Sequence, residues 1–328
     1  MKKNIYIISV LVFLLALATA CGSKSTPETK PTTIALNTAI PELKENPDLV
    51  PGEPNPEVER TLEDSDASIK AEEHRAVSGD NILNNLFERP FTAQEMDYQP
   101  DLNILTVSIT SDDAFFFFTI TLDGMDPLSG TLSGTYGMEF DRTQTGRGDL
   151  LVLVSNPAVE WSMKNMTVYV NPTVSVGGTR PVIAEEGYEG AGYTEMVELG
   201  GDQVAWARIA PEDPSAVQIA VSRVLLGNSE EFLWGAWADG GVKDPSLFDY
   251  DDHFGPSEAG SPINTSEDYP IKAVYSLDNT CRLPYGIDDT TGIPGICLSI
   301  PPQEEHKVSC VCVRQCMTHV GCCEWSCE

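Results

Sequence analysis

The residues with the clearest chemistry are the cysteines near the end of the chain. The sequence has nine cysteines. Eight of them follow residue 280: Cys281, Cys297, Cys310, Cys312, Cys316, Cys322, Cys323 and Cys327. Thiols at this density either pair as disulfides, which stabilise a segment too small for its own core, or bind a metal as thiolates. Zinc sites usually use CxxC pairs, whereas the spacings here are CxC and CC. We therefore expect up to four disulfides, with Zn or Cu binding by this tail as the alternative.

A second group of candidate ligands lies in the loop from residue 141 to residue 149. Oxygen-bearing side chains occupy its first, third, fifth and ninth positions, namely Asp141, Thr143, Thr145 and Asp149, and Gly146 falls among them. Calcium loops have alternating oxygen ligands of this kind and a glycine at their sharp turn. Ca²⁺ is the cofactor that this loop would bind. Only two of the four side chains are carboxylates, so a polar hairpin connection is the alternative.

The densest acidic cluster of the central region consists of Asp249, Asp251, Asp252 and His253 around Tyr250. Carboxylates at this density could bind a hard cation or accept hydrogen bonds from the hydroxyl groups of a sugar. The cluster follows the last of the long apolar segments described below. An exposed acidic loop is therefore the alternative interpretation.

Trp237 is the first candidate for an aromatic surface that binds a ligand. It lies in the segment 232–238 (FLWGAWA), which has the composition of a strand. Side chains alternate along a strand, so Phe232 and Trp234 share one face, while Leu233 and Trp237 share the other. One face must pack in the core. Because Trp237 lies next to the polar end of the segment, we expect its ring to be exposed and able to stack on a sugar.

Catalytic patterns are scarce. Of the four histidines, only His253 lies in the central region, so any Ser/His or Cys/His mechanism would depend on it. The sequence contains no GxSxG, HExxH or phosphate-binding glycine loop. We therefore expect a protein that is not an enzyme. A hydrolase with an unrecognised carboxylate site is a further alternative.

The N-terminus has the layout of a secretory signal. Lys2 and Lys3 precede an apolar run over residues 5–17, and small residues at 18–20 precede Cys21. This placement of Cys21 resembles the lipobox of bacterial lipoproteins, although Ala18 stands where leucine is usual. The resemblance implies that residues 1–20 are a signal peptide and that Cys21 carries the lipid, such as palmitate. It also implies an extracytoplasmic protein that is attached to the cell membrane through this lipid only.

The charge of the chain excludes several classes of partner. The sequence contains 20 Lys and Arg against 50 Asp and Glu, a formal net charge of −30. Such a surface repels phosphate backbones and anionic headgroups, so binding to nucleic acid or to a membrane surface by charge is not expected. Hydrophobic residues make up 41% of the chain, which is enough for a sizeable core.

The order of the segments predicts an all-β protein. Residues 21–79 are rich in Pro, Thr, Glu and Lys without periodicity, which predicts a disordered linker. Short apolar, β-branched and aromatic runs bounded by turn residues follow, and this pattern favours an antiparallel β-sandwich over residues 80–280. The cysteine-rich tail would occupy residues 281–328. Four successive phenylalanines at 115–118 predict a strand that is covered on both faces.

The central region resembles the β-sandwich of DOMON domains and family-9 carbohydrate-binding modules. The shared features are the segments DLNILTVSIT, DDAFFFFTITL, TYGMEFD, VQIAVSRVLLG and FLWGAWAD. The resemblance implies the sandwich fold and makes a surface or extracellular glycan the leading ligand, but it assigns no binding residues. The resulting hypothesis is a lipoprotein at the cell surface with a non-enzymatic role in binding or display.

Overall fold

The computed structural model describes the sandwich and its nearest connections. The described residues are 49–75, 77, 79–82, 85–144, 148–172, 192–241, 243–248, 250–262, 270–287 and 297, with the backbone alone at 251–252, 310–315 and 322–327. All of them belong to the compact unit Leu43–Glu328. Within this part of the chain, no helix is long and apolar enough to cross a membrane.

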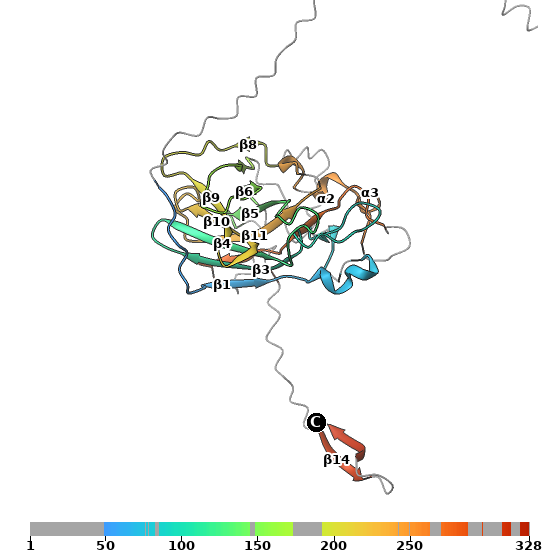
Figure 1. The fold of residues 1–328 in the computed structure, drawn as a ribbon. Helices are drawn as coiled ribbons and strands as arrows, with labels where there is room; N and C mark the ends of the chain where they lie inside the picture. The colour runs from blue at the N-terminus through green and yellow to red at the C-terminus, as the bar shows by residue number, and fades with distance from the viewer. Residues whose placement is uncertain are drawn as a thin grey trace, which may run out of the picture. The chain divides into compact units, whose positions relative to one another are not determined.

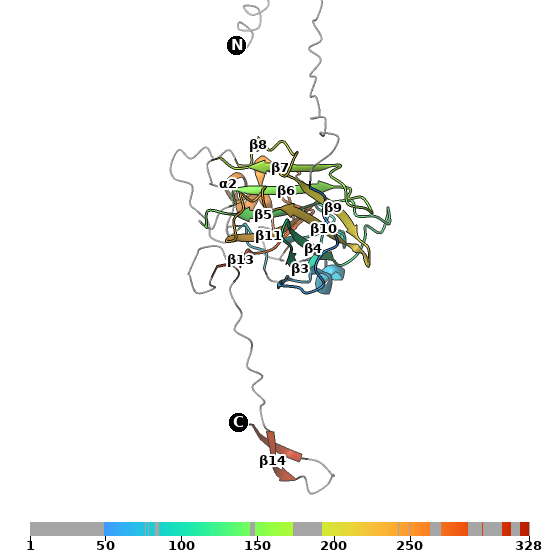
Figure 2. The same cartoon turned by 90° about the vertical axis from the view of Figure 1, so that its left-hand side faces the viewer.

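The strands form two antiparallel sheets and a separate hairpin (Figures 1 and 2). The first sheet has the order β1-β3-β4-β10-β9, with bounds Arg60–Glu63, Ile104–Ser111, Phe115–Leu122, Asp213–Ser222 and Ala205–Ala210. The second has the order β2-β12-β11-β5-β6-β7-β8, with bounds Glu88–Arg89, Leu277–Asn279, Phe232–Asp239, Thr135–Asp141, Leu150–Ser155, Met166–Val170 and Glu195–Met196. In addition, β13 (Leu283–Tyr285) pairs with β11, and β14 (Cys310–Gln315) pairs with β15 (Cys322–Cys327). The predicted all-β, antiparallel sandwich is confirmed.

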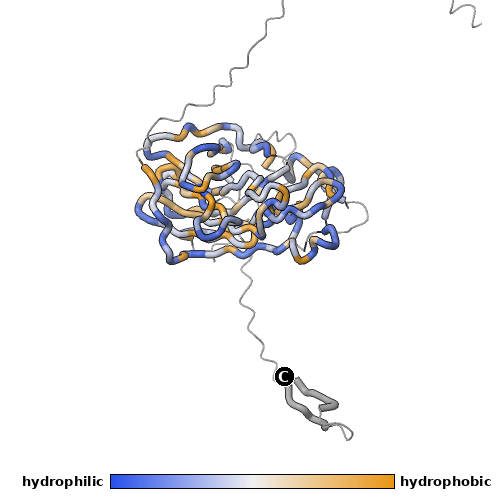
Figure 3. Tube along the Cα trace, in the orientation of Figure 1, coloured by the Kyte–Doolittle hydropathy of each residue, from blue (hydrophilic) through white to orange (hydrophobic). Residues whose placement is uncertain are grey.

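The core between the sheets is built from the alternating side chains of the central strands. Phe116 and Phe118 of β4 pack there with Phe140, Phe232 and Trp234 of the opposite sheet. Hydrophobic and hydrophilic residues alternate along the trace of the sandwich (Figure 3). Interdigitated aromatic side chains of this size bury most of the apolar surface that stabilises the fold.

Strand β4 is covered on both faces, as the run of four phenylalanines predicts. The other two, Phe115 and Phe117, lie in a second apolar cluster on the outer face of the first sheet, with Met163, Val204 and Ala220. That cluster is closed by the half-buried side chain of Trp161, whose ring lies 6.1 Å from that of Phe117. The five-stranded sheet therefore has apolar contacts on each side.

Strand β11 of the second sheet is also covered on both faces, and every one of its residues is buried. Its outer side is covered by the short helices of residues 245–259, which are η3 (Pro245–Leu247), α2 (Tyr250–His253) and α3 (Pro256–Ala259). The rings of Phe248 and Tyr250 pack on the ring of Trp237 in tilted arrangements, with centroids 4.7 and 6.0 Å away. This layer turns what would be a half-exposed sheet into a buried one.

The sandwich begins before residue 80, where the sequence predicts its start. Strand β1 pairs with β3, and Leu62 of β1 is buried in the core. The 3-10 helix η1 (Ala67–Glu73) follows, and the Asp66 carboxylate caps it by accepting from the Ser68 amide. Ala67 is fully buried. Leu62 and Ala67 are the apolar side chains that dock this segment. Because these two residues form no regular pattern, the segment lacks the periodicity from which a strand or helix is predicted. Residues 21–48 lie outside the described part of the chain.

The sandwich also extends beyond the predicted boundary at residue 281. Strand β12 pairs with the end of β11, and β13 pairs with its beginning, so the segment 277–285 runs along nearly the whole of β11. The amide of Cys297 donates to the Arg282 carbonyl at 2.7 Å. The first residues assigned to the tail are therefore part of the second sheet.

A buried ion pair ties this segment to the sheet. The Arg282 guanidinium donates to the Glu139 carboxylate of β5 at 2.6 Å, and both side chains are less than 5% exposed. The same carboxylate accepts from the Tyr193 hydroxyl at 2.5 Å and the Trp237 indole at 3.2 Å. Burial lowers the pKa of Arg282, but the charge and hydrogen bond of Glu139, together with the influence of Tyr193 and Asp141, outweigh burial and raise this pKa. Each charge is thus paired and hydrogen-bonded, as a buried ion pair requires.

Removal of Glu139 should therefore be costly. We expect Glu139→Ala to lower the free energy of unfolding by about 3–5 kcal/mol, because it leaves the Arg282 charge buried without its partner. The double variant Glu139→Met/Arg282→Met should be less destabilised than Glu139→Met alone, since it removes both charges. Urea denaturation followed by tryptophan fluorescence measures these differences.

The control is the exposed pair of Lys70 and Glu73, which are 2.7 Å apart. Glu73→Ala should leave the free energy of unfolding nearly unchanged, because solvent screens an exposed ion pair. Equal effects of Glu139→Ala and Glu73→Ala would contradict a structural role for the buried pair.

Candidate ligand pocket

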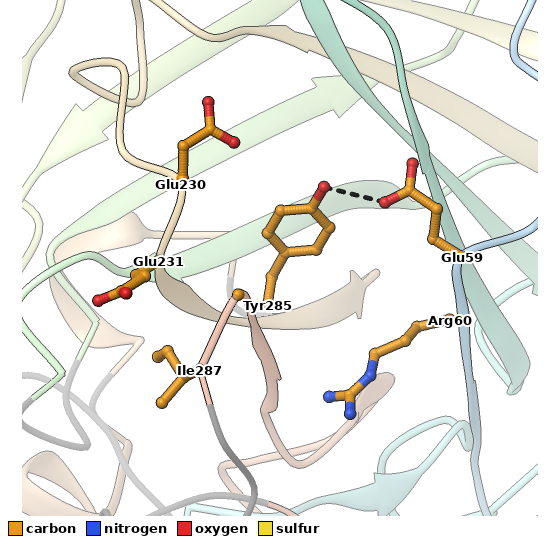
Figure 4. A pocket seen from close by; sticks show the side chains of 7 residues that line it. Glu59, Arg60, Glu230, Glu231, Tyr285 and Ile287 are labelled. Carbon is orange, nitrogen blue, oxygen red and sulfur yellow. Dashed lines mark hydrogen bonds between the residues drawn. The ribbon is translucent and has the colours of Figure 1, made fainter.

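An open pocket lies where β13 meets the start of β1 and the turn before β11. Its volume is about 510 Å³, and it is lined by Glu59, Arg60, Glu230, Glu231, Tyr285, Gly286 and Ile287 (Figure 4). Three of these residues are glutamates, and all three are exposed. The pocket therefore presents carboxylates around one aromatic ring.

The Tyr285 ring forms the floor of this pocket. The register of β13 with β11 places Tyr285 opposite Phe232, and the two rings stack with centroids 5.1 Å apart and planes at 15°. Phe116 meets Tyr285 edge to face at 5.0 Å. Figure 4 shows the Tyr285 ring between Glu59 and the two glutamates at 230 and 231, with its hydroxyl directed at Glu59. One face of the half-buried ring is thus stacked on the core, and the side chain lines the pocket.

The polar groups around the ring are held by contacts of their own. Glu59 accepts hydrogen bonds from the hydroxyls of Tyr285 at 2.9 Å and Ser111 at 2.8 Å. Glu230 accepts from the Arg223 guanidinium at 2.6 and 2.8 Å. The Arg60 guanidinium donates to the carbonyl of Pro284, next to Tyr285, at 2.5 Å. The arrangement is therefore partly ordered before any ligand binds, which lowers the entropic cost of binding.

Gly286 lets the chain pass close to the turn that carries Glu230. Its φ is +70°, and a Cβ atom at this position would lie 1.9 Å from the Glu230 carbonyl oxygen. No other residue type fits this conformation and this distance. The glycine thus fixes the distance between the ring and the acidic side of the pocket.

The Tyr285 hydroxyl is a hydrogen-bond donor at neutral pH. Burial raises the pKa of this hydroxyl, and the hydrogen bond to Glu59 raises it further, against the lowering effect of Ser111. The proton therefore stays on the Tyr285 oxygen and is shared with the Glu59 carboxylate. This bond leaves further lone pairs of Glu59 free to accept from a ligand.

The prediction of an exposed Trp237 is wrong. Its side chain is 1% exposed, and its ring packs under Phe248 and Tyr250. The alternation of faces in the segment 232–238 is confirmed, because Phe232 and Trp234 lie in the inter-sheet core and Trp237 on the opposite side. What the sequence pattern cannot show is the second layer that covers that side.

The acidic cluster of residues 249–253 is described only in part. Asp249 lies outside the described residues, as do the side chains of Asp251 and Asp252, whose backbone belongs to α2. His253 is exposed. Tyr250 within the cluster is buried and donates its hydroxyl to the Asp239 carboxylate at 2.8 Å. Its role is thus structural, and ligand binding by the acidic residues stays a prediction.

The loop predicted to bind Ca²⁺ uses its carboxylates for its own hydrogen bonds. Asp141 accepts from the amide and hydroxyl of Thr143 at 3.1 and 2.9 Å. Asp149 accepts from the amide and guanidinium of Arg142 at 2.8 and 2.6 Å. Thr145 lies outside the described residues. These contacts suit the polar hairpin alternative, and the Ca²⁺ site in this loop stays a prediction.

The disulfide prediction is confirmed for one pair, Cys281 and Cys297. In the hairpin of β14 and β15, Cys310 lies opposite Cys327 in the backbone register. The side chains of the hairpin cysteines, and Cys316 and Cys21 as a whole, lie outside the described residues. Their pairing and lipidation remain predictions.

Comparisons with known proteins give this pocket no precedent. No protein-family model, curated protein or solved structure matches the chain. The pocket residues themselves were not found from the sequence. Glu59 was assigned to the linker and Tyr285 to the cysteine-rich tail, so nothing in the pattern placed them together.

The disulfide at Cys281 should stabilise the floor of the pocket. It closes a loop with a sequence separation of 16 residues. The double variant Cys281→Ser/Cys297→Ser should lower the free energy of unfolding by about 3 kcal/mol, because the unfolded chain loses a constraint. Urea denaturation measures the change. Reductant should destabilise the wild-type sandwich to the same extent. The sandwich of the double variant should not respond to reductant. If the stability of the wild-type protein did not change with reductant, this would contradict a stabilising role of the disulfide.

Proposed function

We propose that this chain is a non-catalytic carbohydrate-binding protein, held outside the cytoplasm by a lipid on Cys21. The observation that carries the carbohydrate proposal is the Tyr285 ring, which lies flat on the floor of an open pocket surrounded by carboxylates. A flat aromatic ring suits the apolar face of a pyranose. The carboxylates of Glu59, Glu230 and Glu231 can accept hydrogen bonds from sugar hydroxyls.

The charge of the pocket narrows the class of sugar. Three glutamates line the pocket, and its arginine, Arg60, already donates to a backbone carbonyl. Anionic ligands such as uronic acids, sulfated sugars and phosphates would be repelled, in keeping with the net charge of −30. Neutral or amino sugars are the expected ligands. The resemblance of the central region to family-9 carbohydrate-binding modules agrees with this proposal.

The contacts of the carboxylates favour binding over catalysis. Glycoside hydrolysis needs one carboxyl group that donates a proton and a second that acts as base or nucleophile. Glu59 accepts from two hydroxyls and Glu230 accepts from Arg223, so both act as hydrogen-bond acceptors. These are the roles of groups that hold a ligand in place.

Binding should depend on the face of the Tyr285 ring. A glycan array probed with the mature chain should identify neutral or amino glycans, and isothermal titration with the best of them gives its affinity. Tyr285→Ala should weaken binding about tenfold or more, which corresponds to about 1.4 kcal/mol. Tyr285→Phe should retain most of the affinity, because it keeps the ring and loses only the hydroxyl.

Trp161 provides the matched control. It is half-buried, and its ring is stacked under Arg208 at 4.3 Å, so Trp161→Ala removes a partly accessible aromatic ring elsewhere. This variant should bind the glycan as the wild type does. Equal loss in Tyr285→Ala and Trp161→Ala, or retention of affinity in folded Tyr285→Ala, would place the binding site elsewhere.

Attachment to the membrane should depend on Cys21. The basic residues, apolar run and small residues before Cys21 support lipidation, and this leaves an even number of cysteines for disulfides. We expect Cys21→Ala to abolish incorporation of a labelled fatty acid and to release the protein from the membrane fraction or leave it unprocessed. A single acyl chain anchors only weakly, so the acyl chains act together. Labelling of the Cys21→Ala protein would contradict this assignment.

A further inference from the structure

Three carboxylates from distant parts of the chain meet at one end of the sandwich. They belong to Asp64, Glu88 and Asp278, and one oxygen of each lies within 4.8 Å of the others. This group, which we term the acidic triad, shares no residue with the pocket above Tyr285. It was not recognised in the sequence, where its members are separated by about two thirds of the chain.

The fold brings the triad together from both sheets. Glu88 of β2 and Asp278 of β12 are direct partners in the antiparallel register, so their side chains share one face. Asp64 directly follows β1 of the other sheet, and its amide donates to the Leu105 carbonyl of β3. Like charges directly opposite one another in a sheet are destabilising. The register therefore creates a repulsion that some other group must relieve.

Each member of the triad has a buried oxygen without a hydrogen-bond partner. These atoms are Oδ2 of Asp64, Oε2 of Glu88 and Oδ1 of Asp278. Glu88 is 4% exposed, and Asp278 is not exposed at all. A buried polar atom without a partner costs about 1–3 kcal/mol, and more if it is charged. Three carboxylates that lie this close together, each with a buried oxygen that lacks a partner, point to a missing positive charge.

The neighbouring arginine does not supply that charge. The carboxylate of Asp80 accepts from Arg89 Nε at 2.6 Å and Nη2 at 2.9 Å. Arg89 Nη1 donates to the carbonyls of Ala259 and Val274. All three nitrogens of Arg89 are thus occupied, and its charge is matched by Asp80. Among the residues that the structure describes, no Lys or Arg forms an ion pair with a carboxylate of the triad.

The electrostatic cost appears in the pKa values of the triad. Burial raises the pKa values of Asp64 and Asp278 above their ordinary values. Burial, together with the charges of Asp278 and Asp64, raises the pKa of Glu88. These directions follow from the burial of the three carboxylates and from their closeness.

We propose that the acidic triad is a Ca²⁺ site. Calcium binds oxygen ligands at 2.3–2.6 Å, so oxygens around one ion lie up to about 5 Å apart, which agrees with the spacing of the triad. Mg²⁺ requires shorter bonds in a regular octahedron and keeps several waters. Asp64 as a residue is less buried than Glu88 and Asp278, although its Oδ2 is buried as their oxygens are.

The backbone beside the triad closes around Glu88. Gly79 has a φ of +143°, and a Cβ atom there would lie 2.9 Å from Glu88 Oε1 and 3.2 Å from the Ser65 hydroxyl oxygen. Only glycine permits this approach. The site is thus formed by three segments, and a bound ion would join the first sheet to the second.

The test uses the mature chain after removal of metals with a chelator. Isothermal titration with Ca²⁺ should give one ion per chain at the triad, and Ca²⁺ should raise the melting temperature. Glu88→Gln and Asp278→Asn should each weaken Ca²⁺ binding at least tenfold. Without Ca²⁺, each variant should be at least as stable as the metal-free wild type, because it removes a like charge. A loss of Ca²⁺ binding in these variants would therefore not be explained by unfolding.

Glu63→Gln is the matched control, because Glu63 is the exposed neighbour of Asp64 at the end of β1. It changes the net charge as the triad variants do, and its affinity for Ca²⁺ should equal that of the wild type. Three outcomes would overturn the proposal: no Ca²⁺ binding by the wild type, equal loss in Glu63→Gln, or tighter binding of Mg²⁺ than of Ca²⁺. The glycan titration uses Tyr285 variants, whereas the Ca²⁺ titration uses variants of the acidic triad. A negative result in one experiment therefore does not bear on the other proposal.

Discussion

The rest of the structure depends on the pairing of the segment 277–285 along β11. This segment forms β12 and β13, which together extend over both ends of β11. Between them, Arg282 reaches the Glu139 carboxylate, and Cys281 is tied to Cys297. Backbone pairing alone would allow the segment to slip, because a strand can shift its register when neither face is specified. The buried ion pair fixes one register, because a shift would bury both charges without partners.

That single register has consequences at three places. It sets Asp278 opposite Glu88 and close to Asp64. It sets Arg282 against Glu139, the carboxylate that also accepts from the Trp237 indole. It also stacks Tyr285 on Phe232, where the Tyr285 side chain lines the pocket. The two candidate sites and the structural ion pair are therefore parts of one strand placement.

The sequence predicts those features that depend on local periodicity. The four phenylalanines of β4 pack on alternate sides, and Phe232 and Trp234 face the core as the alternation requires. Prediction from the sequence fails where the burial of a residue depends on a second layer of structure or on a segment that is distant in the chain. Trp237 is buried by short helices that have no strong pattern, and β1 is docked by the single buried side chain of Leu62. Sites assembled from Glu59, Asp64 and Tyr285 depend on pairings between distant segments, which no spacing in the chain encodes.

The edge strands of the two sheets affect the tendency of this protein to aggregate. Strand β1 has four residues, while β2 and β8 have two each, and all three contain charged side chains. The other edge strand of the first sheet, β9, has six residues, and its Ala207 exchanges backbone hydrogen bonds with Ser162. A long, flat sheet edge offers unpaired amides and carbonyls on which another chain can add as an extra strand. Edges that are short and charged, or partly paired as β9 is, offer few such groups. A protein rich in buried β-strand aromatics can thus remain free of edge-to-edge aggregation without a helix to cover these ends.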